Sequence, residues 1–109
     1  MDLVNQRRFE VYLAALDPTR GAEMKKTRTC IVVSPDISND ILSTVVVVPV
    51  TSSTRGYPTR VRLRLNNRDG EAAIDQIRAL DKSRLRRKLG TLDALAAQRI
   101  KQKLAEFFS

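Results

Sequence analysis

The side chains of this chain that can take part in chemistry are of few types. Its 109 residues include no His and one Cys, Cys30, which excludes an internal disulfide, a Cys/His zinc site and a His-dependent catalytic triad. Any catalysis must therefore come from Arg, Lys, Thr, Ser, Tyr or carboxylate side chains. Cys30 lies in an apolar run, so we expect it to be a small core residue and not a nucleophile.

Positive charge is abundant and unevenly distributed. The chain has 20 Lys and Arg residues against 12 Asp and Glu, which gives a net charge of +8. Residues 29–54 hold none of the 20, whereas residues 55–109 hold 14. Such segregation creates a local field that concentrates an anionic partner, most often a nucleic acid. The alternative is a solvated rim around an apolar core.

The composition is that of one globular domain spanning residues 1–109. Hydrophobic residues make up 42% and aromatic residues 5%, so the core must consist mainly of Val, Leu, Ile and Ala. No apolar stretch is long enough for a membrane span or a signal peptide. We therefore expect a cytoplasmic protein without a membrane partner.

Four segments have the pattern of β-strands. Two are β-branched runs, and one begins with apolar residues at every second position, as in a half-buried strand. The fourth alternates strictly and places Arg60, Arg62 and Arg64 on one solvated, basic face. These predicted strands span residues 9–16, 28–34, 44–51 and 59–66, with a loop at 35–43.

The C-terminal part of the chain is predicted to end in a helix. Residues 71–77 have the pattern of a further strand, and residues 81–89 that of a short basic turn or helix. An amphipathic helix follows, with Thr91 as its N-cap and Asp93 in its first turn. Its apolar face consists of Leu92, Leu95, Ala96, Ile100, Leu104, Phe107 and Phe108. Short strands followed by one terminal helix predict a mainly β (α+β) domain, a small barrel with helical cover.

Short motifs follow one another in order across almost the whole chain. They are Val11-Tyr12-Leu13, Leu16-Asp17-Pro18-Thr19-Arg20-Gly21-Ala22-Glu23, Lys25-Lys26-Thr27-Arg28, Val32-Val33-Ser34-Pro35, Pro49-Val50-Thr51-Ser52, Tyr57-Pro58-Thr59-Arg60-Val61, Gly70, Asp75-Gln76-Ile77-Arg78 and Asp81-Lys82-Ser83-Arg84-Leu85. None is specific alone, but the ordered set is hard to obtain by chance. Together these motifs resemble the MazF/PemK family of toxin endoribonucleases.

This resemblance implies a fold, an activity and partners. The fold is an SH3-like β-barrel of the CcdB/PemK kind with a C-terminal α-helix, assembled as a homodimer, which also buries apolar surface that a small barrel leaves exposed. The activity is that of a toxin of a type II toxin-antitoxin system, which cleaves single-stranded RNA at short sequence motifs without a metal ion or cofactor and so inhibits translation and growth. A cognate antitoxin inhibits such a toxin by placing its C-terminal segment in the RNA groove.

The resemblance places the catalytic pair at Arg28 and Thr51. In metal-free cleavage the ribose 2′-hydroxyl attacks the adjacent phosphorus, and negative charge grows on the non-bridging oxygens. The planar guanidinium of Arg28 can clamp two of those oxygens, and the Thr51 hydroxyl can donate to the same phosphate or orient the attacking group. Without the resemblance, a structural explanation would be preferred for Arg28 and Thr51, with Arg28 a strand-edge residue that binds backbone or solvent.

A base must also accept the proton of the 2′-hydroxyl. Glu23 is the nearest candidate by motif, because it lies in the segment that leads to Arg28. The alternative is a loop carboxylate that pairs with a Lys.

Further side chains are expected to bind the RNA. Lys25 and Lys26 can hold flanking phosphates, and Tyr57 can stack on a splayed base, unless its ring belongs to the core. The remaining predicted RNA-binding residues are Arg20, Ser52, Ser53, Arg55 and Gln76. Arg60, Arg62 and Arg64 either reach the site or act only through long-range attraction.

One position departs from the family pattern. The residue after Arg28 is usually Pro in this family and is Thr29 here, which restores a backbone donor but still favours a strand. We hypothesise that Thr29 loosens Arg28 and lowers the rate of cleavage. Two other functions stay open at this point: a catalytically weak member that binds RNA or antitoxin, and a CcdB-like gyrase poison.

Overall fold

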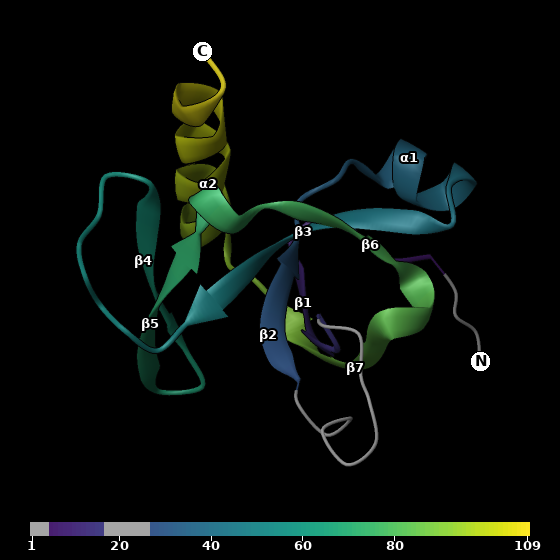
Figure 1. Ribbon diagram of the computed structural model, residues 1–109, viewed down its shortest axis with the longest axis horizontal. Coiled ribbons are helices and arrows are strands. Elements are labelled where there is room, and N and C mark those ends of the chain that lie inside the picture. The colour runs from purple at the N-terminus through teal and green to yellow at the C-terminus, as the bar shows by residue number, and fades with distance from the viewer. Residues whose placement is uncertain (1–4, 17–26) are drawn as a thin grey trace.

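The strands form one strongly curved antiparallel sheet with a helix packed beside one end (Figure 1). The computed structural model describes residues 5–16 and 27–109. Along the sheet the strand order is β4-β5-β3-β2-β1-β7, and β6 also pairs with β3. The strands are β1 (Glu10–Ala14), β2 (Arg28–Val32), β3 (Thr44–Thr51), β4 (Arg60–Leu65), β5 (Arg68–Ala73), β6 (Arg78–Asp81) and β7 (Leu85–Thr91). The helices are α1 (Asp36–Ile41) and α2 (Ala94–Phe107), with 3-10 turns η2 (Ile74–Gln76) and η3 (Lys82–Arg84).

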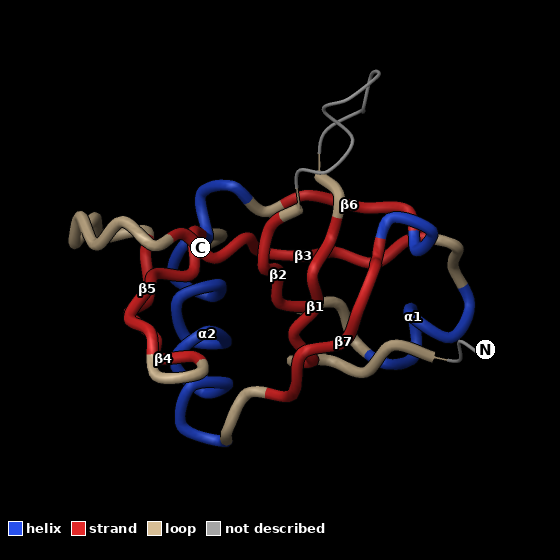
Figure 2. The backbone as a smooth tube through the Cα atoms, turned by 90° about the horizontal axis from the view of Figure 1, so that it is seen from below, coloured by secondary structure: helices blue, strands red, loops and turns tan. Residues whose placement is uncertain are grey.

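Strand β3 is the centre of the architecture. One of its edges pairs with β2 over Val47–Pro49, and its other edge pairs with β6 over Thr44–Val47 and then with β5 at Val50 and Thr51. Because β6 and β5 follow one another along the same edge, the sheet bends there. Figures 1 and 2 show α2 beside β4 and β5, and α1 on the other side of the molecule. None of the described helices is long and apolar enough to cross a membrane.

Two apolar clusters lie on opposite faces of β2 and β3. Residues of these strands alternate between them: Ile31 and Val48 join the cluster that α2 covers through Ile100, whereas Val32 and Val47 join the other. This two-sided burial explains why both strands read as continuous β-branched runs instead of alternating ones. Cys30 is fully buried in the second cluster, as predicted.

The strong sequence patterns are confirmed. The predicted strands at 9–16, 28–34, 44–51 and 59–66 contain β1, β2, β3 and β4, and the amphipathic helix is α2. β4 and β5 form a tight hairpin through Asn66 and Asn67, whose φ angles of 51° and 64° are tolerated by Asn in such turns. Arg28 is the first residue of β2, so it has strand geometry although Thr29, and not Pro, follows it.

Several weaker predictions are wrong. Residues 36–41 form α1 and not part of a loop, because buried Asn39 holds this polar segment against the sheet. The short basic turn or helix predicted at 81–89 is present only as η3, and residues 85–89 belong to the edge strand β7. β7 pairs with β1 through two register shifts, which interrupt the period of two by which a strand is recognised.

The remaining corrections concern strand and helix ends. The strand predicted at 71–77 ends at Ala73 and gives way to η2, and β6 follows it. The N-cap of α2 is Asp93 and not Thr91, because the Asp93 carboxylate accepts a hydrogen bond from the Ala96 N–H at 2.8 Å. Leu95, Phe107 and Phe108, predicted on the buried face, are 64%, 40% and 66% exposed.

Candidate active site

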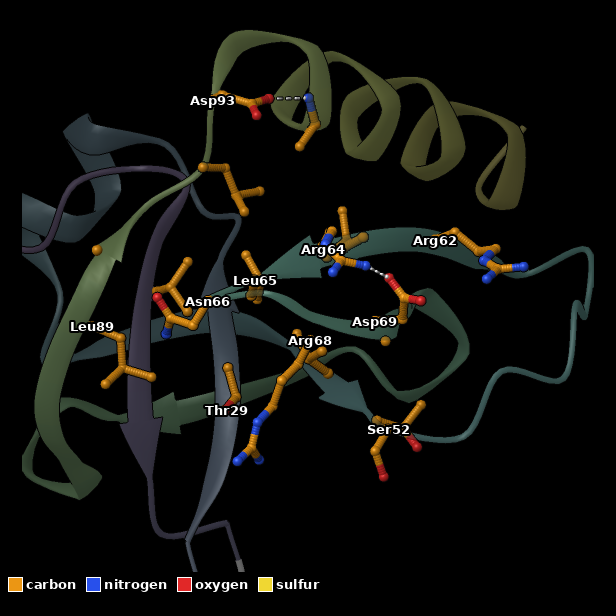
Figure 3. Close-up of a pocket in the computed structure, with 18 of the residues that line it drawn as sticks. Thr29, Ser52, Arg62, Arg64, Leu65, Asn66, Arg68, Asp69, Leu89 and Asp93 are labelled. Atoms are coloured by element: carbon orange, nitrogen blue, oxygen red, sulfur yellow. Dashed lines mark hydrogen bonds and ion pairs between the residues drawn. The ribbon is translucent and has the colours of Figure 1, made fainter.

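A cavity of about 1220 Å³ opens between the N-terminal end of α2, the β4–β5 hairpin and the ends of β2 and β3 (Figure 3). Arg28 and Thr51 both line it, together with Thr29 and Ser52. The two residues that the family resemblance singled out, 23 positions apart in the sequence, thus lie in one cavity.

The pairing of β2 with β3 explains why Arg28 and Thr51 come together. Cys30 lies opposite Pro49 in this antiparallel ladder. Two residues further along each strand, the same register places Arg28 opposite Thr51, just beyond the last paired residues. Arg28 is exposed and Thr51 is half-buried, so a ligand can reach both side chains.

The hydroxyl of Thr51 is oriented by its own loop. Its Oγ1 accepts a hydrogen bond from the Ser53 N–H at 3.1 Å, which leaves the hydroxyl proton free to donate to a ligand. Gly70 of β5 supports this position from the other side. A Cβ at Gly70 would lie 2.8 Å from the Thr51 carbonyl oxygen, so β5 can approach β3 here only with glycine.

The rim of the cavity is basic. Arg62 and Arg64 of β4, Arg68 of β5 and Arg99 of α2 line it. Arg64 pairs with Asp69 at 2.8 Å, whereas Arg62, Arg68 and Arg99 form no ion pair with any residue in the described parts of the chain. Figure 3 shows Arg68 reaching from the hairpin into the space in front of β2. Of the three arginines predicted on the basic face of β4, two therefore reach the cavity.

Arg60 differs from the prediction. Its side chain is 9% exposed and does not belong to a solvated face. Its Nε donates to Asp75 Oδ1 at 2.9 Å and its Nη2 to Asp75 Oδ2 at 3.3 Å, while its Nη1 lies 3.5 Å from Glu71 Oε1. The alternation of β4 correctly placed Arg60 on the face opposite Val61, but the sequence contains no local signal that two carboxylates from 71–75 lie there.

The ring of Tyr57 belongs to the surface and not to the core. It is 46% exposed, and the Arg60 guanidinium lies 5.0 Å from its centroid. This cation–π contact holds one face of the ring and leaves the side chain accessible. Of the two alternatives for Tyr57, a ring that stacks on a base and a ring in the core, the structure is compatible with the first.

The other predicted site residues are distributed as follows. Ser52 lines the cavity, whereas Ser53, Arg55, Tyr57 and Gln76 are exposed but are not among the described residues that line it. Glu23, Arg20, Lys25 and Lys26 lie outside the described residues. Within residues 5–16 and 27–109, no cluster of three or more His, Cys, Asp or Glu side chains is arranged to hold a metal ion.

Two groups of residues at the site were not predicted. Arg68 and Arg99 lie far apart in sequence, and only the packing of α2 against β4 brings them to one cavity. Glu71 lies in a segment that was predicted to be a strand, and no role was predicted for its side chain. A single carboxylate between Gly70 and the apolar Ala72 is a signal for a buried, paired acid. Its side chain is fully buried.

Cys30 is close to the site but is not reactive. It is fully buried, and burial raises the pKa of its thiol to about 11 although Arg28 and Arg78 act in the opposite direction. The thiolate form is therefore scarce at neutral pH.

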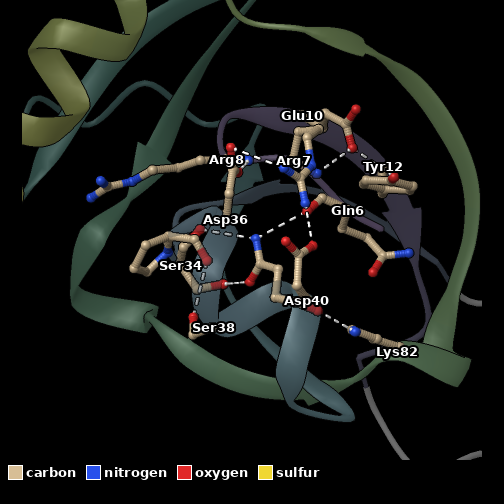
Figure 4. Close-up of polar contacts among 12 residues, drawn as sticks. Gln6, Arg7, Arg8, Glu10, Tyr12, Ser34, Asp36, Ser38, Asp40 and Lys82 are labelled. Carbon is tan, nitrogen blue, oxygen red and sulfur yellow. Dashed lines mark hydrogen bonds and ion pairs between the residues drawn. The ribbon is translucent and has the colours of Figure 1, made fainter. Parts of the chain in front are cut away.

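A second polar cluster lies away from the cavity, where Figure 4 shows Gln6, Ser34 and Ser38 close together at α1. The Asn39 amide donates to the carbonyl oxygens of Gln6 and Ser34 at 3.2 and 3.0 Å, and its Oδ1 accepts from the Ser34 hydroxyl. Ser34 Oγ in turn accepts from the Val46 N–H at 2.9 Å. Every polar atom of the buried Asn39 side chain is used within the fold, so this cluster joins structural elements and offers nothing to a ligand.

Comparisons with known proteins agree with this geometry. A family model described as PemK-like, MazF-like toxin of type II toxin-antitoxin system matches residues 7–108. The chain is 36% identical over 89 residues to the endoribonuclease toxin MazF of Escherichia coli (strain K12). The matched residues cover 81% of this chain and 80% of that protein.

Solved structures give the same picture. A mycobacterial endoribonuclease in complex with its cognate antitoxin superimposes with a TM-score of 0.80 at 26% identity, covering 94% of each chain. A MazE-MazF structure from Deinococcus radiodurans has a TM-score of 0.80 at 26% identity and covers 96% of each chain.

Proposed function

This chain belongs to the family of PemK-like, MazF-like toxins of type II toxin-antitoxin systems, and on this premise we propose that it is an endoribonuclease that cleaves single-stranded RNA at short sequence motifs. Cleavage of messages in the cytoplasm would inhibit translation and growth. The observation that carries the proposal is the presence of Arg28 and Thr51 together in one cavity with a basic rim.

The proposed reaction needs no metal ion. The 2′-hydroxyl of the ribose attacks the adjacent phosphorus, the bond to the 5′-oxygen of the next nucleotide breaks, and a 2′,3′-cyclic phosphate and a 5′-hydroxyl result. Arg28 donates to two non-bridging oxygens and stabilises the charge that grows on them. Thr51 donates a hydrogen bond from its hydroxyl to the same phosphate. Glu23 accepts the proton of the 2′-hydroxyl, and the leaving 5′-oxygen takes up a proton from water.

The RNA is proposed to extend from the catalytic pair along the basic rim. Arg62, Arg68 and Arg99 lack ion-pair partners in the described structure and are positioned to bind phosphates on one side. On the other side the loop at 52–59 carries Ser52, Ser53, Arg55 and Tyr57, and Lys25, Lys26, Arg20 and Gln76 complete the predicted set.

Two protein partners are proposed. A cognate antitoxin binds the same basic cavity through an acidic and apolar C-terminal segment, because such a segment complements both the net charge of +8 and apolar lining residues such as Leu65 and Leu92. A second copy of this chain forms a homodimer. The exposed side chains of Ile37 and Ile41 of α1 and of Leu42, which follows it, support this, since a dimer would remove them from water. Sedimentation at micromolar concentration checks it, and a monomer contradicts it.

The test of the proposed activity uses long single-stranded RNA in EDTA. We expect the purified protein to produce discrete fragments with 5′-hydroxyl ends, and Arg28→Ala to reduce the rate by roughly 10²–10³-fold, as for the loss of one donor to a developing oxyanion. Because Arg28 is exposed, its removal should leave the unfolding free energy within about 0.5 kcal/mol.

Arg87→Ala is the matched control. Arg87 is an exposed arginine of β7 outside the described cavity lining, so its removal changes net charge equally and should leave cleavage unchanged. RNA that stays intact with the unaltered protein contradicts the proposal. It would favour a protein that only binds RNA or antitoxin, and gyrase-dependent DNA breaks in expressing cells would favour a gyrase poison.

A further inference from the structure

A fully buried carboxylate lies beneath the loop at 52–59. Glu71 of β5 has no exposed surface, and the β4–β5 register places it opposite Arg62, on the face of the hairpin that carries the arginines of β4. Burying a charged carboxylate is costly unless hydrogen bonds and an opposite charge compensate for it. The partners of Glu71 therefore show what this charge holds in place.

Most of those partners belong to the loop. The Gly56 N–H donates to Glu71 Oε2 at 2.8 Å, and the Arg55 N–H bonds to the same carboxylate. Gly56 has a φ of 71°, which lets two successive N–H groups turn toward one anion. These backbone bonds lower the pKa of Glu71 in spite of burial, so the carboxylate is ionised at neutral pH. Two backbone N–H groups of the loop therefore bind the buried, negatively charged Glu71 carboxylate.

Arg60 connects Glu71 with the side chain of Tyr57. Its guanidinium contacts Glu71 and grips both oxygens of Asp75, and the same guanidinium lies against the Tyr57 ring. Tyr57 is thus connected to the sheet through one cation. The Tyr57 carbonyl also accepts from the Arg60 N–H at 3.0 Å, which closes the end of the loop.

Glu71 also lies next to the proposed catalytic residues. It is paired with Thr51 in the β3–β5 ladder, and it follows Gly70, which touches the Thr51 carbonyl. One residue therefore connects the strand end that carries Thr51 with the loop that carries Arg55 and Tyr57. A hydrophobic side chain at this position would serve stability about as well as a buried ion pair, so fixing the loop is the specific contribution of the charge.

We propose that Glu71 is a positioning residue for RNA: it holds the loop at 52–59 in the conformation that presents the exposed Tyr57 ring to a base next to the cleavage site. This inference rests on the proposed endoribonuclease function. A loop that is already ordered loses less conformational entropy when RNA binds. Glu71 consequently affects RNA binding and the choice of base beside the cleaved bond, and not the chemical step.

The first test measures the loop in the free protein. The chain has no Trp, so Tyr57→Trp provides a single fluorescent reporter in the loop. Adding Glu71→Gln preserves the shape of the side chain but removes its charge. We expect lower Trp anisotropy and easier quenching by acrylamide than in Tyr57→Trp alone. Unchanged anisotropy and quenching would overturn the proposal, and this readout does not depend on any cleavage activity.

The second test measures RNA. In the protein with Tyr57 intact, Glu71→Gln should raise KM by roughly tenfold and leave kcat within about twofold, because the interaction lost is one of binding. The affinity for an RNA that carries a 2′-deoxyribose at the cleaved position should fall by the same factor. A lower kcat with unchanged KM and affinity contradicts the assignment. If the unaltered protein neither binds nor cleaves RNA, the proposed function fails, while the fluorescence result still decides whether Glu71 orders the loop.

Two further variants separate positioning from folding. Glu10→Gln is the matched control: Glu10 is also buried, accepts from a backbone N–H of Arg7 at 2.8 Å and pairs with Lys88 at 2.7 Å, but lies outside the described cavity lining. It should change neither KM nor the reporter. Gly56→Ala strains the exposed loop at positive φ without entering the core, since nothing lies within 4 Å of its Cβ. It should reproduce the higher KM even if Glu71→Gln does not fold, and an unchanged KM in Gly56→Ala would count against the proposal.

Discussion

The two ends of β3 each carry a polar cluster, and the clusters are built differently. Near the start of β3, Asn39 and Ser34 form a neutral network in which amide and hydroxyl groups satisfy one another and the nearby backbone. At the other end Glu71, Arg60 and Asp75 form a charged network. The first ties α1 and the segment before β1 to the sheet, whereas the second holds a loop beside an open cavity.

This difference separates scaffold from site. A neutral amide network has fixed geometry and does not respond to pH, so it suits a permanent connection between elements. A carboxylate that gathers loop N–H groups, together with an arginine that also contacts an exposed ring, fixes a segment that must remain accessible. The position of each network predicts which property of the protein a substitution there will change.

The largest expected effect on stability is at the neutral cluster. Asn39→Ala removes the partner of the Ser34 hydroxyl and of two buried carbonyl groups, so the unfolding free energy should fall by about 2–4 kcal/mol. Urea unfolding measures this. The cleavage rate per folded molecule should be unchanged, and Ser38→Ala, which removes an exposed hydroxyl on the same helix, is the control. A specific loss of activity in folded Asn39→Ala would break the distinction between scaffold and site.

At Gly70 we expect a smaller loss of stability than at Asn39, but a larger loss of cleavage activity. Gly70→Ala forces β5 away from the Thr51 carbonyl and should cost about 1–3 kcal/mol as an overpacked contact, while reducing cleavage because Thr51 moves. Ala79→Gly on β6, opposite Val46 at the other end of β3, is the control, with a cost of about 0.5–1 kcal/mol and no change in cleavage. Equal losses of activity in both variants would show that Gly70 acts through stability alone.

The smallest effect is a response to acid that only the charged cluster should show. Hydrogen bonds from Gly56 and Arg55 lower the pKa of Glu71 below its ordinary value of 4.5 against the effect of burial, and Arg60 lowers that of Asp75 below 3.8. Because both pKa values are lowered on folding, the stability that these groups contribute is complete above their ordinary values and is lost as the pH falls through the lowered ones.

The Tyr57→Trp reporter measures that response. We expect constant anisotropy from about pH 8 to pH 5 and a decrease only below pH 4.5, where protonation of Glu71 begins to release the loop. Glu71→Gln should remove most of this dependence. A change in anisotropy between pH 7 and pH 6 would assign the control of the loop to other groups.

The elements with local signals could be identified from the amino-acid pattern alone. Two-sided burial made β2 and β3 continuous β-branched runs, and the alternation of β4 and the four-residue period of α2 identified these elements without structural information. The ordered motifs were enough to indicate the family, and the burial of Cys30 followed from its position in an apolar run.

The packing of the folded chain, by contrast, determines which residues share the cavity and which are paired. Arg62, Arg68 and Arg99 line one cavity because the hairpin and α2 pack around the end of the sheet. The Arg60 side chain instead binds two carboxylates that lie 11 and 15 positions away in the sequence. Glu71 meets the loop through the β3–β5 register, and α1 forms around Asn39 although its residues are typical of a loop. In each case the deciding contact joins residues far apart in the sequence, through packing, a hydrogen bond or an ion pair, and local periodicity does not encode it.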